Sequence, residues 1–275
     1  MNNIIYGKPI AERILADVAN CLQDFKKPKL LIFVTRDGES ESIYIQKKKE
    51  VAGQLGVEVK IGDISKKTES EALKEMQKEI DTYQPDGAIV QLPVVSEFGQ
   101  QRIIDLIPRE IDIDMLTTES EALFQQNKSD ILPPVVGAID AILKEIDCTV
   151  EHKTVAIVGR GKLVGKPAEV YFKSNGATVR VIEKGDNIKS NTKDAQIVVS
   201  GAGEKHIIKG EMIQAESVVI DVGFTQENGR IFGDVEIESV APKARAVAPV
   251  PGGVGPITIA MLFQNLCHAL RIKTS

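Results

Sequence analysis

The stretch Val155-Ala-Ile-Val-Gly159-Arg-Gly161-Lys-Leu-Val-Gly165-Lys-Pro167 decides the fold of the second half of this chain. An apolar run ends in a glycine turn, and a helical pattern continues from there through Phe172. A second strand is predicted at 177–182, which places the glycines in a strand–helix–strand frame. The spacing has one residue more than the usual dinucleotide fingerprint, but this order of elements still predicts a Rossmann-like nucleotide site.

The rest of the chain extends this alternation of strands and helices. Short β-branched runs at 196–200 and 218–222 continue the second half. In the first half we predict strands and helices in alternation, at 29–35, 41–55, 57–61, 69–83 and 87–92. Alternation of this kind predicts parallel sheets flanked by helices, an α/β fold. We therefore expect two domains, 1–118 and 119–256, joined by a helix at 135–146, with a C-terminal helix 257–272 that completes the first.

A second glycine-rich stretch, Ala248-Pro-Val-Pro-Gly-Gly-Val-Gly-Pro-Ile-Thr258, precedes that C-terminal helix. Its glycines Gly252, Gly253 and Gly255 allow backbone N–H groups to approach a ligand closely. Its prolines restrict the loop and lower the entropy lost when it is ordered. The loop leads to a helix N-terminus, which favours anionic or carbonyl groups. A tight structural turn before the helix is the alternative interpretation.

Composition excludes several classes of function. The chain has 275 residues, 27% of them charged, a net charge of −5 and no basic patch, which argues against binding to nucleic acid. No apolar run reaches the roughly 18 residues of a membrane span, and residues 1–6 lack the pattern of a signal peptide. The three cysteines are far apart, so we expect no disulfide framework and a cytoplasmic location. The histidines show no metal-ligand spacing, and no metal is expected.

Polar residues in the first half suggest a site. Tyr44 and Lys48 are four residues apart on a predicted helix and share a face, although such a pair is also common on a plain surface. Gln91 ends a predicted strand, where ligands bind in open α/β sheets. Asp112 and Asp114 follow in a loop, where aspartates also serve as turn and capping residues.

Taken together, the motifs resemble those of the bifunctional methylenetetrahydrofolate dehydrogenase/methenyltetrahydrofolate cyclohydrolases, over nearly the whole chain. The resemblance rests on Tyr44-x3-Lys48, Val90-Gln-Leu-Pro93, Asp112-Ile-Asp114, the turn Gly159–Pro167, Val219-Ile-Asp-Val-Gly223, Gly233-Asp-Val235 and Pro249-Val-Pro-Gly-Gly-Val-Gly-Pro256. It implies a two-domain enzyme of one-carbon folate metabolism and purine biosynthesis, with a cleft between the domains and a homodimeric assembly. The chain departs from the family at Ile111-Asp-Ile-Asp-Met115 and Leu132-Pro-Pro-Val135.

The resemblance also implies roles for individual residues. Lys48 would be the general acid/base of the cyclohydrolase step, Gln91 would hydrogen-bond it, and Asp114 would hydrogen-bond the pterin. Tyr44 would stack on the aminobenzoyl ring, and these four are the expected catalytic residues. The expected substrate-binding residues are Tyr44, Gln91, Leu92, Asp114, Pro251, Gly252 and Gly253. The expected cofactor-binding residues are Gly159, Arg160, Gly161, Val164, Gly165, Glu183, Lys184, Gly201, Gly223, Gly255 and Thr258.

The nicotinamide cofactor depends on the end of the second Rossmann strand. An acidic residue there accepts from the ribose 2′-OH of NAD, whereas a basic residue accommodates the 2′-phosphate of NADP. Glu183 favours NAD, and Arg160 and Lys184 favour NADP. We expect NADP, with NAD as the alternative.

The resemblance therefore implies oxidation of 5,10-methylenetetrahydrofolate with NAD(P)⁺, followed by hydrolysis of the methenyl product to 10-formyltetrahydrofolate. One alternative is another NAD(P)-dependent oxidoreductase of a small substrate, which leaves the 249–256 loop unexplained. The other is a non-catalytic folate- or nucleotide-binding relative, which the altered aspartate loop would favour.

Overall fold

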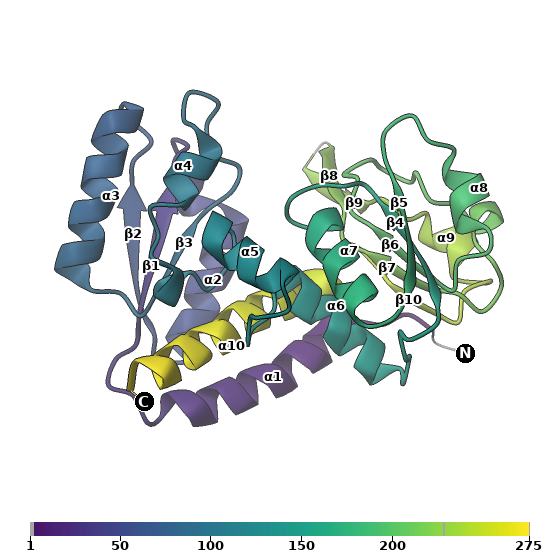
Figure 1. Ribbon diagram of the computed structural model, residues 1–275, viewed down its shortest axis with the longest axis horizontal. Helices are drawn as coiled ribbons and strands as arrows, with labels where there is room; N and C mark the ends of the chain where they lie inside the picture. The colour runs from purple at the N-terminus through teal and green to yellow at the C-terminus, as the bar shows by residue number, and fades with distance from the viewer. Residues whose placement is uncertain (1–2, 228, 275) are drawn as a thin grey trace. The chain divides into compact units, whose positions relative to one another are not determined.

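The computed structural model describes residues 3–227 and 229–274 (Figure 1). It divides into two compact units. The three-stranded unit comprises Ile14–Pro134 and Leu262–Ser275, and the five-stranded unit comprises Met1–Arg13 and Val135–Met261. Helices α1 (Gly7–Leu22) and α10 (Val254–Thr274) each contribute residues to both units.

The three-stranded unit is built on a parallel sheet of order β2-β1-β3. Lys29 of β1 pairs with Glu58 of β2, and Leu30 pairs with Gly87 of β3. Its elements in chain order are β1 (Lys29–Val34), η1 (Glu39–Glu41), α2 (Ile43–Gln54), β2 (Glu58–Asp63), α3 (Glu69–Tyr83), β3 (Gly87–Val90), α4 (Gln100–Ile104), η2 (Arg109–Ile111) and α5 (Thr118–Gln125).

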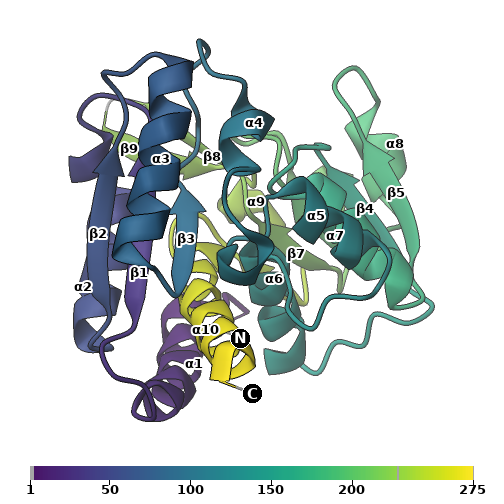
Figure 2. The ribbon, with the colours of Figure 1, turned by 60° about the vertical axis from the view of Figure 1, so that its left-hand side comes forward.

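Both faces of this sheet are buried. Leu31, Phe33 and Val90 pack on one face in a cluster with Met76 of α3 and Ile103 of α4, and Figure 2 shows α3 in front of the strands. On the other face, a side chain at Gly87 would meet Leu266 of α10. Burial on both faces explains why β1 and β3 read as nearly continuous apolar runs, whereas the edge strand β2 carries Glu58, Lys60 and Asp63.

The five-stranded unit contains a parallel sheet of order β10-β7-β6-β4-β5, with a separate antiparallel hairpin of β8 and β9. Its elements in chain order are α6 (Pro134–Glu145), β4 (Thr154–Val158), α7 (Gly165–Ser174), β5 (Thr178–Ile182), α8 (Ile188–Thr192), β6 (Ile197–Ser200), η3 (Gly210–Met212), β7 (Val218–Asp221), β8 (Phe224–Glu227), β9 (Arg230–Gly233), α9 (Ile237–Val240) and β10 (Ala246–Ala248). The strand order reverses between β4 and β6, which is the point where open α/β sheets bind ligands.

The N-terminal segment extends this unit at β10. Ile4 forms a parallel bridge with Val247, and Ile5 N–H donates to the Val247 carbonyl at 2.8 Å. Gly7 N–H then donates to the Gly252 carbonyl at 2.8 Å. These bonds place Ile4, Ile5 and Gly7 with the five-stranded unit.

The α/β fold with two parallel sheets is confirmed, and several details differ from expectation. Helix α10 begins at Val254, three residues before the predicted start, so that Gly255 and Pro256 lie in its first turn. The sequence patterns did not reveal α1, α5 or the β8–β9 hairpin. The expected domain boundary at 118/119 coincides with the start of α5, which the contacts keep within the three-stranded unit.

The expectation of no disulfide is wrong. The structure joins Cys21 of α1 to Cys267 of α10, with their Cα atoms 6.4 Å apart. The two residues are 246 positions apart, but the C-terminal parts of both helices lie side by side in the three-stranded unit (Figures 1 and 2). Cys148 is a buried free thiol.

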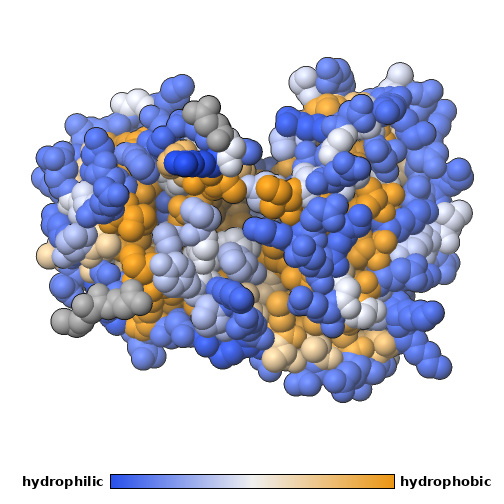
Figure 3. All heavy atoms as spheres, turned by 180° about the vertical axis from the view of Figure 1, so that it is seen from behind, coloured by the Kyte–Doolittle hydropathy of each residue, from blue (hydrophilic) through white to orange (hydrophobic). Residues whose placement is uncertain are grey.

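The surface agrees with the charged composition. Hydrophilic residues cover most of the face in Figure 3, with apolar residues between them. Among residues 3–227 and 229–274, no helix combines the length and the apolar character that crossing a membrane requires.

Candidate active site

Lys48 and Gln91 form a direct hydrogen bond in the three-stranded unit. Lys48 Nζ donates to Gln91 Oε1 at 2.7 Å. The Gln91 amide donates in turn to the Leu92 carbonyl at 2.9 Å, and its backbone N–H donates to the Phe33 carbonyl at 2.8 Å. Because the Gln91 Nε2 group donates to Leu92, the side chain is oriented with Oε1 toward Lys48. Two predicted catalytic residues are therefore brought together, with the predicted substrate residue Leu92 beside them.

Helix α2 orients the Lys48 side chain toward Gln91. Ser42 caps the helix by accepting from Ile45 N–H at 3.4 Å, and Ile45 and Ala52 are its buried residues. Lys48 is partly buried, whereas the adjacent Lys47 and Lys49 are exposed. The middle lysine of the three is thus the one that the helix turns inward.

Burial changes the acid–base chemistry of Lys48 and Asp114. Desolvation lowers the pKa of Lys48, and the negative charges of Asp114 and Glu39 partly oppose that shift. Desolvation also raises the pKa of Asp114 to about 6, an effect that Lys48 reduces and Asp112 increases. A lysine with a lowered pKa can exchange protons near neutral pH, as a general acid/base requires.

Asp112 has a structural role in the same loop. Its carboxylate accepts from Thr117 N–H at 2.9 Å, from Thr117 Oγ1 at 2.7 Å and from Leu116 N–H at 3.3 Å. Met115, in the loop between Asp112 and Leu116, has φ of 56°, in the left-handed region that favours glycine. The hydrogen bonds of the buried Asp112 stabilise this strained turn. Asp112 is occupied by these bonds, so Asp114 is the acidic side chain of the loop that can bind a ligand.

Asn265 of α10 was missed by the sequence reasoning. Its side chain is 2% exposed and donates to the carbonyls of Ile113 at 2.9 Å and Leu132 at 3.0 Å. It thereby secures the loop on both sides of Asp114. An amide with apolar residues at 261–263 and 266–267 around it was the available signal, because a buried amide needs partners.

Tyr44 lies one helical turn before Lys48 and is 40% exposed. Partial burial, with a smaller contribution from the charge of Glu39, raises the pKa of its hydroxyl. An exposed aromatic ring beside the lysine is available for stacking against a flat ligand. The charge of Glu39 acts to raise the pKa of both Tyr44 and Lys48, and this residue was not identified from the sequence.

The glycine turn of the five-stranded unit is too tight for side chains. A Cβ at Gly165 would lie 2.0 Å from the Gly159 carbonyl oxygen, and one at Gly159 would lie 2.8 Å from the Gly201 oxygen. A Cβ at Gly201 would meet Val164 at 2.6 Å. Four of the predicted cofactor residues therefore converge at the carboxyl ends of β4 and β6. Such a backbone cradle fits the phosphates of a dinucleotide.

Gly165→Ala is expected to destabilise the protein by about 1–3 kcal/mol, because the added methyl group overlaps the backbone of Gly159. Gly161→Ala is the matched control, since a Cβ there meets no atom within 4 Å. We expect it to change the free energy of unfolding by less than about 0.5 kcal/mol. Urea denaturation of both variants without cofactor measures the difference, and equal stabilities would contradict the packing.

Arg160 and Glu183 form an exposed ion pair beside this turn. Arg160 Nη1 lies 3.3 Å from Glu183 Oε1, and Arg160 Nε lies 3.5 Å from Glu169 Oε2. Lys184 is exposed next to Glu183. The three predicted specificity residues thus gather at the end of β5, with one carboxylate already facing one cation.

The 249–253 loop is held by its own backbone. Gly253 N–H donates to the Pro249 carbonyl at 2.7 Å, and a Cβ at Gly253 would meet that oxygen at 2.6 Å. Gly252 has φ of 104°, and Pro251 follows a cis peptide bond. In α10, Gly255 has open space around it and Thr258 Oγ1 donates to the Val254 carbonyl at 3.1 Å.

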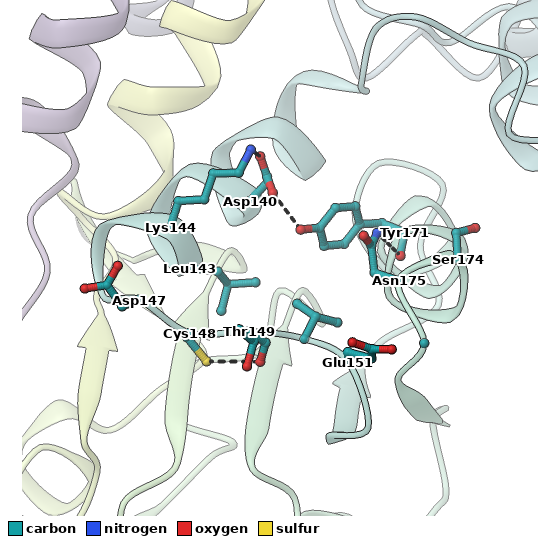
Figure 4. Close-up of a pocket in the computed structure, with 12 residues that line it drawn as sticks. Asp140, Leu143, Lys144, Asp147, Cys148, Thr149, Glu151, Tyr171, Ser174 and Asn175 are labelled. Atoms are coloured by element: carbon teal, nitrogen blue, oxygen red, sulfur yellow. Dashed lines mark hydrogen bonds and ion pairs between the residues drawn. The ribbon is translucent and has the colours of Figure 1, made fainter.

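A hollow of about 710 Å³ lies elsewhere in the five-stranded unit (Figure 4). Tyr171 donates to Asp140 at 2.7 Å at its edge. The described residues that line it include none of those predicted for the site: they are Asp140, Leu143, Lys144, Asp147, Cys148, Thr149, Val150, Glu151, Tyr171, Ser174, Asn175 and Gly176.

The three-stranded unit carries a lysine–glutamine acid–base site, and the Rossmann-like unit carries a glycine cradle. Together they indicate the class of protein, which is an α/β enzyme that uses a nucleotide cofactor. Comparison with known proteins specifies the family. The protein-family model for the catalytic domain of tetrahydrofolate dehydrogenase/cyclohydrolase matches residues 5–114. The NAD(P)-binding domain of the same family matches residues 133–274. The chain belongs to the tetrahydrofolate dehydrogenase/cyclohydrolase family.

Individual relatives agree over their full lengths. Bifunctional protein FolD of Hydrogenobaculum sp. (strain Y04AAS1) is 33% identical over 274 residues, covering 98% of this chain and 99% of the relative. The solved bifunctional FolD enzyme of Campylobacter jejuni has a TM-score of 0.92 at 25% identity, covering 98% of this chain and 99% of the other. The bifunctional dehydrogenase/cyclohydrolase of Thermoplasma acidophilum has a TM-score of 0.90 at 28% identity, covering 98% and 99%.

These matches confirm the resemblance on which the sequence interpretation was based. The chain is a dehydrogenase/cyclohydrolase of tetrahydrofolate with an NAD(P)-binding domain. The alternatives, another oxidoreductase of a small substrate or a non-catalytic relative, are not supported.

Proposed function

We propose that this chain catalyses both reactions of its family with the residues described above. A bound NAD(P)⁺ would supply the hydride acceptor for oxidation of 5,10-methylenetetrahydrofolate to its methenyl cation. Water then adds to that carbon, and the ring opens to 10-formyltetrahydrofolate with net release of one proton. The 2.7 Å hydrogen bond between Lys48 and Gln91 is the observation that carries the proposal.

Lys48 is proposed to move the protons of the hydrolysis. The neutral amine accepts a proton from the attacking water and returns it to the ring nitrogen that leaves the carbon. Burial makes the neutral amine accessible by lowering the pKa of Lys48. Gln91 Oε1 fixes the position of Nζ, so the amine is oriented before substrate binds.

The remaining site residues are proposed to bind the folate substrate or the cofactor. In the three-stranded unit, Asp114 accepts from the pterin, Tyr44 stacks on the aminobenzoyl ring, and Leu92 lines the substrate. The loop residues Pro251, Gly252 and Gly253 are proposed as substrate-binding residues on the grounds of the family alone. The cofactor would be held by residues of the five-stranded unit, which are Gly159, Arg160, Gly161, Val164, Gly165, Gly201, Gly223, Gly255 and Thr258.

Separate assays of the two steps test the proposal. Oxidation of methylenetetrahydrofolate is followed by the absorbance of the reduced cofactor, and hydrolysis by the loss of methenyltetrahydrofolate absorbance without cofactor. We expect turnover in both assays. Hydrolysis without oxidation, or oxidation without hydrolysis, would contradict the assignment of both activities to this chain.

The preference for NADP over NAD is a further part of the proposal. The Arg160–Glu183 pair is half exposed, and exposed pairs contribute about 0–1 kcal/mol, so a 2′-phosphate can replace Glu183 as the partner of Arg160. A phosphate can accept two parallel bonds from a guanidinium, whereas the exposed Glu183 is screened by salt.

Glu183→Ser is expected to raise the ratio of kcat/KM for NADP to that for NAD by about three- to tenfold, because a repelling carboxylate is removed. Arg160→Ala should lower the same ratio by a similar factor. Initial rates with both cofactors at matched concentrations measure it. Faster turnover with NAD that is unchanged in Arg160→Ala would show that Glu183 controls the choice instead.

A cytoplasmic location and a homodimeric assembly are also proposed, both on the grounds of the family. Size-exclusion chromatography with light scattering tests the dimer, and a monomeric mass at assay concentrations would contradict it. No binding to nucleic acid or membrane is expected.

A further inference from the structure

Two carboxylates are completely buried in the five-stranded unit and have no role in the activities proposed above. Asp221 ends β7 and Asp234 follows β9, and both are 0% exposed. A buried carboxylate must be compensated by hydrogen bonds, because its desolvation is costly. The partners of these two residues therefore indicate what the pair does.

Asp234 binds the turn that follows β6. Its Oδ2 accepts from Ala202 N–H at 2.7 Å and Gly203 N–H at 3.3 Å, and its Oδ1 accepts from Glu204 N–H at 2.8 Å. Ser200 Oγ donates to Oδ2 at 2.7 Å. Three successive backbone N–H groups of this kind form a concavity that binds anions. Here an internal carboxylate occupies the concavity, so the turn keeps one conformation without any external anion.

Asp221 in turn holds Asp234. Its Oδ1 accepts from Asp234 N–H at 3.2 Å and its Oδ2 from Val235 N–H at 2.9 Å. Glycine is required on both sides, because a Cβ at Gly223 would lie 2.0 Å from Asp234 Oδ2 and one at Gly233 would lie 2.0 Å from Asp221 Oδ2. The predicted cofactor residue Gly223 thus makes room for Asp234.

The turn at 201–204 packs directly against the glycine cradle. A Cβ at Gly201 would meet Val164 at 2.6 Å, and one at Gly159 would meet Ala202 at 3.0 Å. Any displacement of residues 201 and 202 therefore changes the shape of the cradle. The turn also lies at the carboxyl end of β6, beside the point where the strand order reverses.

We propose that Asp221 and Asp234 are positioning residues that lock the turn 201–204 in the conformation that binds the nicotinamide cofactor. The proposal rests on the assignment of the cofactor to the cradle and Gly201. Both carboxylates are 0% exposed, so they act without direct contact with a ligand: Asp234 acts through the backbone of the turn, and Asp221 acts through Asp234. Burial, with the charge of Asp234 adding to it, raises the pKa of Asp221 to about 7, while its backbone hydrogen bonds oppose that shift.

Ser200→Ala tests the lock with one small change. It removes the hydroxyl that donates to Asp234 and leaves the backbone bonds in place. We expect KM and Kd for NADP to rise by roughly tenfold, because a hydrogen bond to a buried charged group is lost. The kcat for oxidation at saturating NADP should change by less than about twofold, and hydrolysis without cofactor should match wild type.

Ser239→Ala is the matched control. Ser239 Oγ also donates to a carboxylate of this unit, Glu236 Oε2, at 2.6 Å, and it accepts from Gly210 N–H at 3.0 Å. It holds a different turn, so its loss should leave Kd for NADP within about twofold of wild type. Equal increases of Kd in both variants would indicate general loosening of the unit and would overturn the proposal.

Thr225→Val provides a second variant that keeps the core intact. Thr225 Oγ1 donates to the Gly203 carbonyl at 2.9 Å from the exposed hairpin. We expect a two- to threefold rise in Kd for NADP, measured by calorimetry. Wild-type affinity in both Ser200→Ala and Thr225→Val would overturn the positioning role. A wild-type protein that binds neither NADP nor NAD would instead overturn the cofactor assignment itself.

Discussion

Lys48→Met is expected to lower the rate of methenyltetrahydrofolate hydrolysis by about 10²–10⁴-fold, which is the usual cost of removing a general acid/base. Methionine has a similar length and no proton to exchange, so the fold should persist. The lost contact is the 2.7 Å hydrogen bond to Gln91 Oε1, which leaves that oxygen without its partner. Hydrolysis assayed without cofactor, together with thermal unfolding, separates lost chemistry from lost structure.

Lys47→Met and Lys49→Met are the matched controls, because both neighbours are exposed on the outer side of α2. We expect both to hydrolyse the substrate at nearly the wild-type rate. An equally small effect in all three variants would contradict the assignment of Lys48. An equally large effect would indicate that the charge of the whole segment matters rather than one inward-facing amine.

Much of the fold could be predicted because strand burial and glycine turns leave local patterns. Helix α3 was predicted with its observed bounds, Glu69–Tyr83, and a capping box between Thr68 and Glu71 fixes its start. Helix α10 was predicted to start too late, because Pro256 was taken as part of the loop. Proline is well tolerated in the first turn of a helix, where its missing N–H has no partner to lose.

Contacts between residues distant in sequence could not be predicted. Cys21 and Cys267 are 246 residues apart, and only the packing of α1 against α10 makes them neighbours. Asp221 and Asp234 both belong to motifs that the sequence shows, but the hydrogen bonds between them depend on the return of the chain through the β8–β9 hairpin. In contrast, Tyr44 and Lys48 lie on one helix, so their shared face followed from the spacing alone.

The roles of the two aspartates in the substrate loop are distinguished by the structure and not by their spacing. Asp112 and Asp114 are equivalent as loop residues in the sequence. In the structure, Asp112 uses both carboxylate oxygens on the backbone and hydroxyl groups of its own loop. This arrangement makes Asp112 a scaffold residue and supports Asp114 as the proposed ligand of the pterin.

Asp114→Asn is expected to weaken folate binding by about 10- to 100-fold at pH 7. A carboxylate accepts strong charge-assisted hydrogen bonds, whereas the amide turns a donor toward a ligand edge that also donates. Because burial raises the pKa of Asp114 to about 6, wild-type KM should rise as the pH falls through 6 and the carboxylate gains a proton. The variant should lack that rise, and KM measured between pH 5 and 8 tests both statements.

Stability separates this effect from unfolding. A carboxyl group whose pKa is raised in the folded state makes folding less favourable as the pH rises from its ordinary value toward 6. Removing it should therefore leave Tm at pH 7 unchanged or higher. Asp112→Asn should do the opposite, lowering Tm by breaking the bonds to Thr117 while the folded protein keeps most of its folate affinity. A larger loss of affinity in Asp112→Asn, measured well below its Tm, would reverse the two roles.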